Sequence, residues 1–128
     1  MGKILTEISE GELLDKITIL EIKLNEIKNE ALIKEVQKEY EILTNIRDKN
    51  IKENKLINDL FIELKSVNKK IWDIENTKRN FEKNKIFDDK FINISREEYK
   101  ANDQRAKIKS KINNLLESNI KEVKQHEL

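Results

Sequence analysis

The chain has 128 residues, of which 40% are charged and 37% hydrophobic, and this balance favours helices with narrow apolar stripes over a thick sheet core. Its 26 basic and 25 acidic residues are interspersed and leave a net charge of +1, which argues against a nucleic-acid partner. With no cysteine for disulfides or thiolate metal sites, and no apolar run near the roughly 18 residues of a membrane span, we expect a cytoplasmic protein.

Helix breakers are nearly absent, since the chain has two glycines and no proline, and we predict few, long helices in one domain over residues 1–128. Residues 1–8 are a lead-in. Ser9 and Glu12 form a predicted capping box, with the serine capping the first turn and Glu12 reaching back. The first helix then runs to about Lys28. Its apolar stripe consists of Leu13, Ile17, Leu20, Leu24 and Ile27.

Two further isoleucines of this first helix, Ile19 and Ile22, lie off its apolar stripe. This position predicts a contact from a second direction, made either by another helix or by a second subunit. A turn around residues 28–30 leads to a second helix from about Ala31 to Asp48. Its inward side chains are predicted to be Leu32, Val36, Tyr40, Leu43 and Ile46.

After a polar connection over residues 48–55, the third helix extends to about Glu82 and is predicted to be the longest. Its apolar stripe consists of Ile57, Leu60, Leu64, Val67, Ile71 and Ile74. A second stripe with the same spacing consists of Phe61, Lys65, Asn68, Trp72, Glu75 and Arg79. Two aromatic and four polar groups on one stripe indicate a functional face, and Asn68 requires hydrogen-bond partners if it is buried.

Residues 83–94 carry irregularly spaced apolar side chains and are predicted to fold as a lid over one end of the helices. Ser95 opens a second capping box and with it the fourth helix, which ends near Ser118. Its core side consists of Ala101, Ile108, Ile112 and Leu115. Residues 119–128 are predicted to be a frayed tail.

The predicted fold class is therefore all-α, an antiparallel bundle of about four helices with a long central third helix. A two-stranded coiled coil is the structural rival, because alternating steps of three and four serve both arrangements. The off-stripe residues Ile19 and Ile22 and the apolar segment 83–94 favour the globular bundle.

Polar faces of the first, third and fourth helices would form one groove if they met. The candidate ligand-binding residues are Glu12, Asp15, Lys16, Lys65, Asn68, Trp72, Glu75, Arg79, Asn102, Asp103 and Arg105. The more common explanation for such charges is a solvated helix face with weak ion pairs, and a helical tryptophan is more often a core residue. Arginine is nevertheless rare here, with 4 against 22 lysines, which suggests that Arg79, Arg96 and Arg105 occupy positions requiring a guanidinium.

A recognisable catalytic set is absent from the sequence. The single histidine, His126, lies in the predicted tail, and no glycine-rich phosphate loop occurs. Carboxylate chemistry remains, since Glu12, Asp15, Glu75 and Asp103 carry the oxygen ligands that Mg²⁺ prefers. No metal or other cofactor is predicted with any definite ligand set.

Three blocks of sequence resemble a family of short bacterial proteins that is known only as a domain of unknown function. The blocks are GELLDKITILEIK at residues 11–23, ELKSVN with IWDIE at residues 63–75, and YxxNDxRAxIK at residues 99–109. The resemblance extends from Gly11 to about Lys124 and implies no established activity. Some members of that family are encoded near glycosyltransferases of surface-polysaccharide clusters, which implies a role in surface-glycan biosynthesis.

Two functions are consistent with these observations. The leading hypothesis is a cytoplasmic helical binding or assembly module, a homodimer, that takes a small phosphorylated or sugar ligand and needs no cofactor. The alternative is a Mg²⁺-dependent enzyme acting on a nucleotide or sugar-nucleotide, with metal on the four carboxylates named above and phosphate on Arg79 and Arg105.

Overall fold

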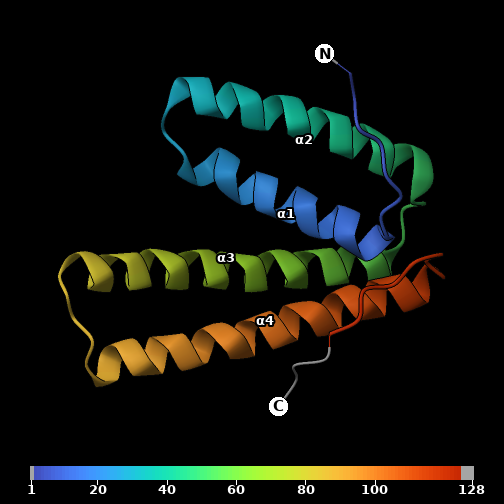
Figure 1. Ribbon diagram of the computed structural model, residues 1–128. Helices are drawn as coiled ribbons and strands as arrows, with labels where there is room; N and C mark the ends of the chain where they lie inside the picture. Colours follow the sequence, from blue (N-terminus) through green and yellow to red (C-terminus); the bar gives the residue numbers. More distant parts are fainter. Residues whose placement is uncertain (1, 125–128) are drawn as a thin grey trace.

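The computed structural model describes residues 2–124, which form four α-helices and no strand. The helices are α1 (Glu10–Glu26), α2 (Glu30–Asn50), α3 (Lys55–Lys83) and α4 (Asp89–Leu115). They form two helical hairpins, α1–α2 and α3–α4, which pack against one another (Figure 1). The predicted all-α bundle is confirmed, and α3 is the longest helix at 29 residues. No helix of the described residues is long and apolar enough to cross a membrane.

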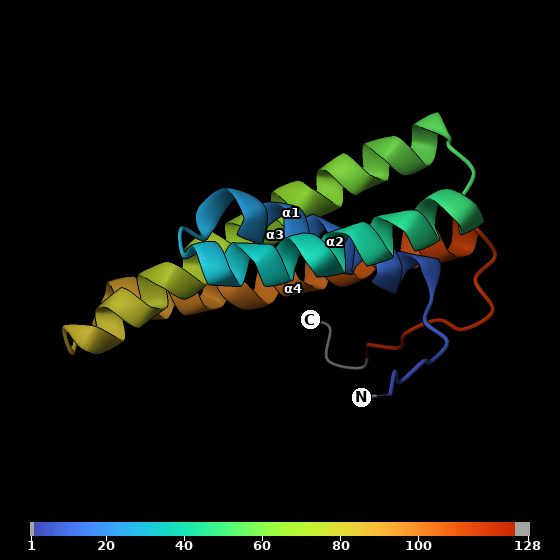
Figure 2. The same ribbon diagram turned by 90° about the horizontal axis from the view of Figure 1, so that it is seen from above.

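The helix that contacts all three others is α1, whereas α2 packs only against α1 within residues 2–124. Figure 2 shows α2 on the outer side of the molecule, and Figure 1 shows the α3–α4 hairpin extending past the α1–α2 turn. The shared core lies between α1, α3 and α4. Its buried members are Leu13, Leu14, Ile17, Ile57, Leu64, Val67, Ile74, Ala101, Ile108 and Ile112.

The predicted inward stripe of α2 is wrong in part. Tyr40 and Leu43 are partly buried against the core, but Leu32 is 55% exposed and Ile46 is 42% exposed. The reason is that α2 has a single neighbouring helix, so only a narrow strip of its surface can be covered, and none of its residues is fully buried. Leu115 at the end of α4, also predicted in the core, is 52% exposed.

Capping boxes predicted the starts of two helices. The predicted start of α1 is confirmed, and the predicted start of α4 is wrong. Ser9 caps α1, since its Oγ accepts a hydrogen bond from the Glu12 amide at 3.0 Å. Helix α4 begins at Asp89 with Asp88 as its cap, so Ser95 lies within the helix and its buried Oγ has no hydrogen-bond partner. An aspartate is a strong cap, and it starts the helix before the serine is reached.

The predicted lid over residues 83–94 is replaced by a tight turn and the first part of α4. Lys85 takes a left-handed conformation with φ of 55°, and the Ile86 amide donates to the Phe81 carbonyl at 2.8 Å, a common way of ending a helix. The apolar residues of this segment gather at the projecting end of the hairpin. The ring centroids of Phe87 and Phe91 are 5.5 Å apart.

Beyond α4, the chain runs back beside the N-terminal segment (Figure 2). The Ser9 hydroxyl donates to Glu122 at 2.7 Å, and the Asn119 amide donates to Glu7 at 2.6 Å. Residues 119–124 of the predicted frayed tail are therefore non-helical but held by side-chain contacts. The last four residues of that tail, including His126, lie outside the described residues.

Candidate functional site

A buried carboxylate joins the three core helices. Asp15 of α1 is 1% exposed and accepts two hydrogen bonds from Arg105 of α4, from Nε at 3.0 Å and from Nη2 at 2.5 Å. Asn68 of α3 donates from Nδ2 to Asp15 at 2.8 Å and to the Thr18 hydroxyl at 2.7 Å. The Thr18 hydroxyl donates in turn to the Asp15 carbonyl at 2.7 Å. One carboxylate thus fixes the relative positions of side chains from three helices.

Electrostatics keep this carboxylate ionised. Burial raises the pKa of Asp15, but hydrogen bonds from Arg105 and Asn68, with the charges of Arg105 and Lys109, outweigh burial and leave the pKa below 3.8. The hydrogen bond to Asp15 likewise raises the pKa of Arg105. The pair uses two of the five N–H groups of the guanidinium, and the other three have no partner in residues 2–124.

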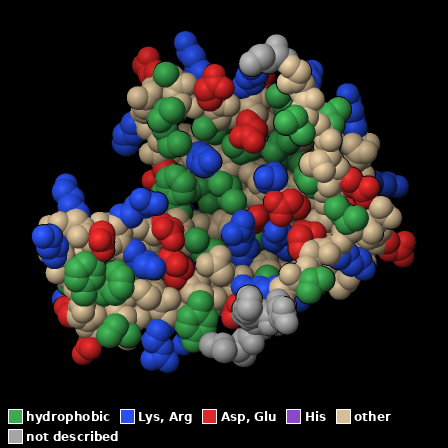
Figure 3. All heavy atoms as spheres, viewed as in Figure 1, with side chains coloured by type: hydrophobic (Ala, Val, Ile, Leu, Met, Phe, Trp, Pro, Cys, Tyr) green, Lys and Arg blue, Asp and Glu red, His purple; other side chains and the backbone are tan. Residues whose placement is uncertain are grey.

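A pocket of about 370 Å³ adjoins this network, with walls from α1, α3 and α4. Figure 3 shows the molecule hollowed between the α1–α2 hairpin and the projecting end of α3–α4, with hydrophobic side chains in the hollow. Five of the residues named from sequence line the pocket: Asn68, Trp72, Glu75, Arg79 and Arg105. The remaining wall residues are Ile19, Ile22, Ile71 and Asn76. Four apolar and five polar side chains, including two guanidiniums, therefore surround one space.

The polar groups of the pocket differ in how many hydrogen bonds and ion pairs they already form with other residues of the protein. Arg79 is exposed and forms no ion pair with any residue between 2 and 124. Both amide hydrogens of Asn68 are used by Asp15 and Thr18, so only its Oδ1 is left to accept a hydrogen bond. The pocket thus offers unused donors from Arg79 and Arg105 and an unused acceptor from Asn68.

Two carboxyl groups meet beside the pocket. The pKa of Glu75 on α3 is raised, first by the hydrogen bond that its protonated form would make to Glu98 of α4, then by burial and by the negative charge of Glu98. Glu98 Oε1 lies 3.4 Å from Lys78 Nζ, whereas its Oε2 is buried without a hydrogen-bond partner. A proton on Glu75 would supply the missing donor to Glu98, so the two groups form a pair able to share one proton.

The other candidate residues lie outside the pocket. Glu12 pairs with Lys109 at 2.6 Å and more distantly with Lys16 at 3.7 Å, so it does not complete the predicted capping box. Lys65 pairs with Glu21 at 2.9 Å. The remaining two are on α4, where Asn102 donates to the Glu98 carbonyl at 3.1 Å and Asp103 pairs with Lys124 at 2.8 Å. The single predicted groove is thus divided into a pocket and a set of ion pairs.

The carboxylates of the metal hypothesis do not come together. Asp15, Glu12 and Asp103 are each paired with a cation, and Glu75 faces Glu98. Within residues 2–124, no group of three or more histidine, aspartate or glutamate side chains is placed to hold a metal ion. The four carboxylates are therefore distributed over separate contacts.

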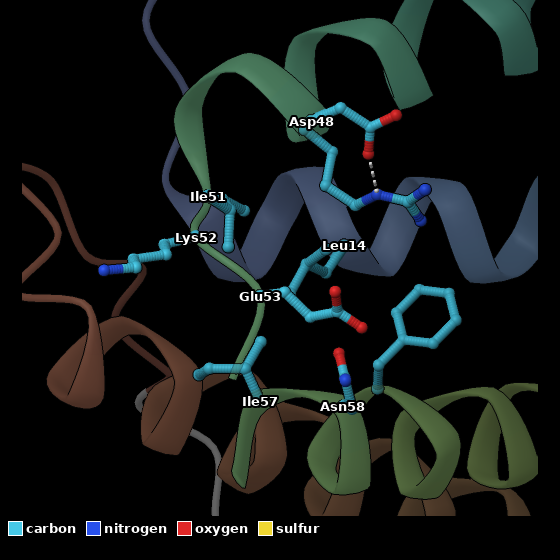
Figure 4. Close-up of a pocket in the computed structure, with 9 residues that line it drawn as sticks. Leu14, Asp48, Ile51, Lys52, Glu53, Ile57 and Asn58 are labelled. Carbon is cyan, nitrogen blue, oxygen red and sulfur yellow. Dashed lines mark hydrogen bonds and ion pairs between the residues drawn. The ribbon is translucent and has the colours of Figure 1, made fainter. Parts of the chain in front are cut away.

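A second pocket, also of about 370 Å³, lies where the α2–α3 connection crosses α1 (Figure 4). Its arginine, Arg47, is paired with Asp48 at 3.1 Å, and the Glu53 carboxylate points into the space. Phe61 of the predicted functional stripe lines this pocket, but none of the eleven candidate ligand-binding residues does. With its one guanidinium already paired, it is the weaker candidate for a polar ligand.

Sequence reasoning assigned some pocket residues to other roles. Ile71 was placed in the core stripe of α3 and does pack against the core, and Ile22 is buried, as expected for contact from a second direction. Both residues, together with Ile19, also form walls of the pocket. Asn76 was not identified. Thr18 of the buried network was also missed, although its spacing of three residues from Asp15 places both on one side of α1 and was a usable signal.

Comparison with known proteins concerns the family rather than the activity. Residues 4–127 match the model of DUF6165, a family of unknown function. The chain belongs to this family. No curated protein and no solved structure matches the chain. DUF6165 membership accords with the resemblance seen in the three sequence blocks and leaves function to be argued from the pocket.

Proposed function

We propose that this DUF6165 protein is a binding module whose ligand is a small molecule held in the pocket between α1, α3 and α4. The observation that carries the proposal is the convergence of Trp72, Arg79 and Arg105 on one space, next to the buried Asp15 network. Small-molecule sites characteristically combine apolar walls with a few fixed polar groups in a volume of roughly 300–1,000 Å³.

The fixed orientation of Arg105 supports a binding role over that of a plain structural ion pair. Asp15 accepts hydrogen bonds from two N–H groups on one edge of the guanidinium, so its remaining donors are positioned before any ligand arrives. Pre-positioned donors lose little conformational freedom on binding, which favours affinity. No ion pair with the described part of the chain constrains Arg79, which can adjust to the ligand.

The experiment uses the single tryptophan of the chain as its probe. Because Trp72 lines the pocket, occupancy should change its fluorescence, and a broad screen of small polar compounds can be read directly from this signal. Binders should lose affinity in Arg105→Gln and keep it in Arg96→Gln, whose arginine is exposed on α4 outside the pocket. A screen without any Trp72 response, or binders indifferent to Arg105→Gln, would contradict the proposal.

The wider setting belongs to the same proposal. We place the protein in the cytoplasm as a homodimer, with a role in surface-glycan biosynthesis as the family resemblance implies. Exposed apolar residues on α2, among them Leu32 and Ile42, support the dimer because contiguous exposed apolar surface often marks an interface.

A further inference from the structure

We infer that the ligand of this pocket is a hydroxylated ring compound bearing one acidic group, with the ring against Trp72 and the acidic group on Arg79 and Arg105. The inference rests on the proposed function and narrows it to a ligand class. Its members include sugar acids and sugar phosphates, which share an anionic group on a polar ring.

The unused donors of the pocket favour an anion. Two guanidiniums line it against one carboxyl group, Glu75. Asp15 offsets the charge of Arg105 but leaves three of its N–H groups unused, and Arg79 has no ion pair within residues 2–124. Guanidiniums bind carboxylate and phosphate through paired hydrogen bonds, and both groups fit the unused donors.

Glu75 and Glu98 can share a proton, which reduces the one negative charge in the wall of the pocket. Facing Glu75 are Glu98 from α4 and Lys78 and Arg79 from its own helix, while α1 contributes only Ile19 and Ile22 to this part of the wall. Two ionised carboxylates side by side repel one another, and the buried Glu98 Oε2 lacks a donor. An anion in the pocket further favours a shared proton on the pair, and so removes negative charge from the site.

The remaining groups select a ring with hydroxyls. Trp72 and Ile71 provide an apolar face, which a bare inorganic anion would leave uncovered. Asn68 Oδ1 is available only as an acceptor and therefore matches an O–H group of the ligand. An aromatic face, an acceptor and two cationic donors together fit a polar ring with an acidic substituent.

The test titrates glucose, glucuronate, glucose 1-phosphate and inorganic phosphate against Trp72 fluorescence. We expect at least one of the two acidic sugars to bind about tenfold or more tightly than both glucose and inorganic phosphate. In Arg79→Gln the acidic sugar should lose about tenfold in affinity, the usual scale for a charge-assisted hydrogen bond, while glucose binding stays unchanged. Arg96→Gln is the matched control and should behave as wild type.

The two acidic sugars show which acidic group the pocket prefers. Tighter binding of glucuronate identifies a carboxylate, and tighter binding of glucose 1-phosphate identifies a phosphate. Equal affinity for glucose and the acids, or no effect of Arg79→Gln, would overturn the inference while leaving the pocket as a binding site. No Trp72 response to the acidic sugars, with hits from the broad screen, would do the same. An absence of hits in both experiments would overturn the proposed function as well.

Discussion

Single residues on α1 determine how closely α4 can approach it. Gly11 lies so near α4 that its amide donates to Asn113 Oδ1 at 2.7 Å. One turn further along, Asp15 binds Arg105 of the same helix. Neither residue stabilises α1 by itself, since Gly11 has no side chain and Asp15 is a buried charge. Both residues are explained by the contact between α1 and α4.

Asp15→Asn should lower the free energy of unfolding by about 3 kcal/mol, because it leaves the Arg105 guanidinium without its counter-charge in a largely buried site. Denaturant titration measures the loss. Asp73→Asn is the control, since its partner Lys69 is partly exposed and such surface pairs contribute little to stability.

The same variant tests the electrostatics through pH. The pKa of Asp15 is lower in the folded than in the unfolded chain, so its contribution is present above the ordinary pKa of 3.8 and is lost as pH falls through the folded-state value. The stability difference between wild type and Asp15→Asn should stay constant from neutral pH down to about 5 and shrink only in stronger acid. A difference that vanished near pH 6 would contradict this account.

Gly11→Ala should destabilise the protein by about 1–2 kcal/mol, even though alanine is the better helix former. An added Cβ would lie 2.6 Å from Asn113 Oδ1 and 2.7 Å from the Lys109 carbonyl, and the backbone atom cannot move aside cheaply. Thermal or chemical unfolding measures the change. Gly2→Ala has open space around it and should be neutral. Unchanged stability in Gly11→Ala would mean that α1 and α4 are not packed this closely.

Glu75→Gln should make ligand binding insensitive to pH between about 5 and 8. In the wild type the raised pKa of Glu75 means that lowering the pH towards it adds a proton and removes repulsion of an anion, so affinity should rise. Glucuronate is the suitable probe because an ordinary carboxyl pKa, about 3.5, keeps its own charge fixed in this range. A wild-type affinity that is flat over this range would exclude a role of the carboxyl pair.

Individual helices illustrate how local signals compete. The start of α4 has two good caps within eight residues, Asp88 and Ser95, and the structure uses the first. The choice lengthens α4 by two turns and brings Phe91 beside Phe81 and Phe87, where their rings pack at the end of the hairpin. Contact between these rings favours the earlier start, and the serine cap remains unused inside the helix.

Paired substitutions distinguish the two starts of α4. Asp88→Ala should cost about 1 kcal/mol, because the Asp88 carboxylate accepts from the Lys90 and Phe91 amides. Ser95→Ala should be neutral or slightly stabilising, since it removes a buried hydroxyl without a partner. Equilibrium unfolding of both variants is the measurement. The reverse pattern, a cost at Ser95 alone, would restore the start predicted from sequence.

The whole molecule is two hairpins that meet through α1. This arrangement leaves the outer side of α2 uncovered and lets α3–α4 project beyond α1–α2, which opens the pocket next to Trp72 (Figures 1 and 3). A closed bundle with four equivalent helices would have filled that space. The pocket is therefore a product of how the hairpins are offset.

We predict that light scattering at micromolar concentration gives a mass near twice 15.3 kDa, the mass of one chain. Leu32, Ile42 and Ile46 are exposed and fall on one side of α2 by helical spacing, which suits contact with a second copy. Ile42→Glu should lower the measured mass, whereas Ile62→Glu on the exposed side of α3 should not. A wild-type mass of 15.3 kDa would remove the dimer from the proposal.

The sequence by itself determined the helices, most of their boundaries and the core stripe of α3, because these depend on spacing and caps within one segment. It also identified five of the pocket residues, since Trp72 and its polar neighbours recur at helical spacing on one face. Such patterns depend only on residues close together in the sequence, so they can be recognised without the tertiary structure.

Only the tertiary structure decided which of the eleven candidates share a site. Glu12 and Asp103 follow the same periodicity as the pocket residues but are taken up by lysines on other segments. Asp15 became a buried support for Arg105, and Ile19 and Ile22 became pocket walls, because α1 lies against both α3 and α4. The offset between hairpins follows from side-chain packing between distant segments, which no spacing within one helix encodes.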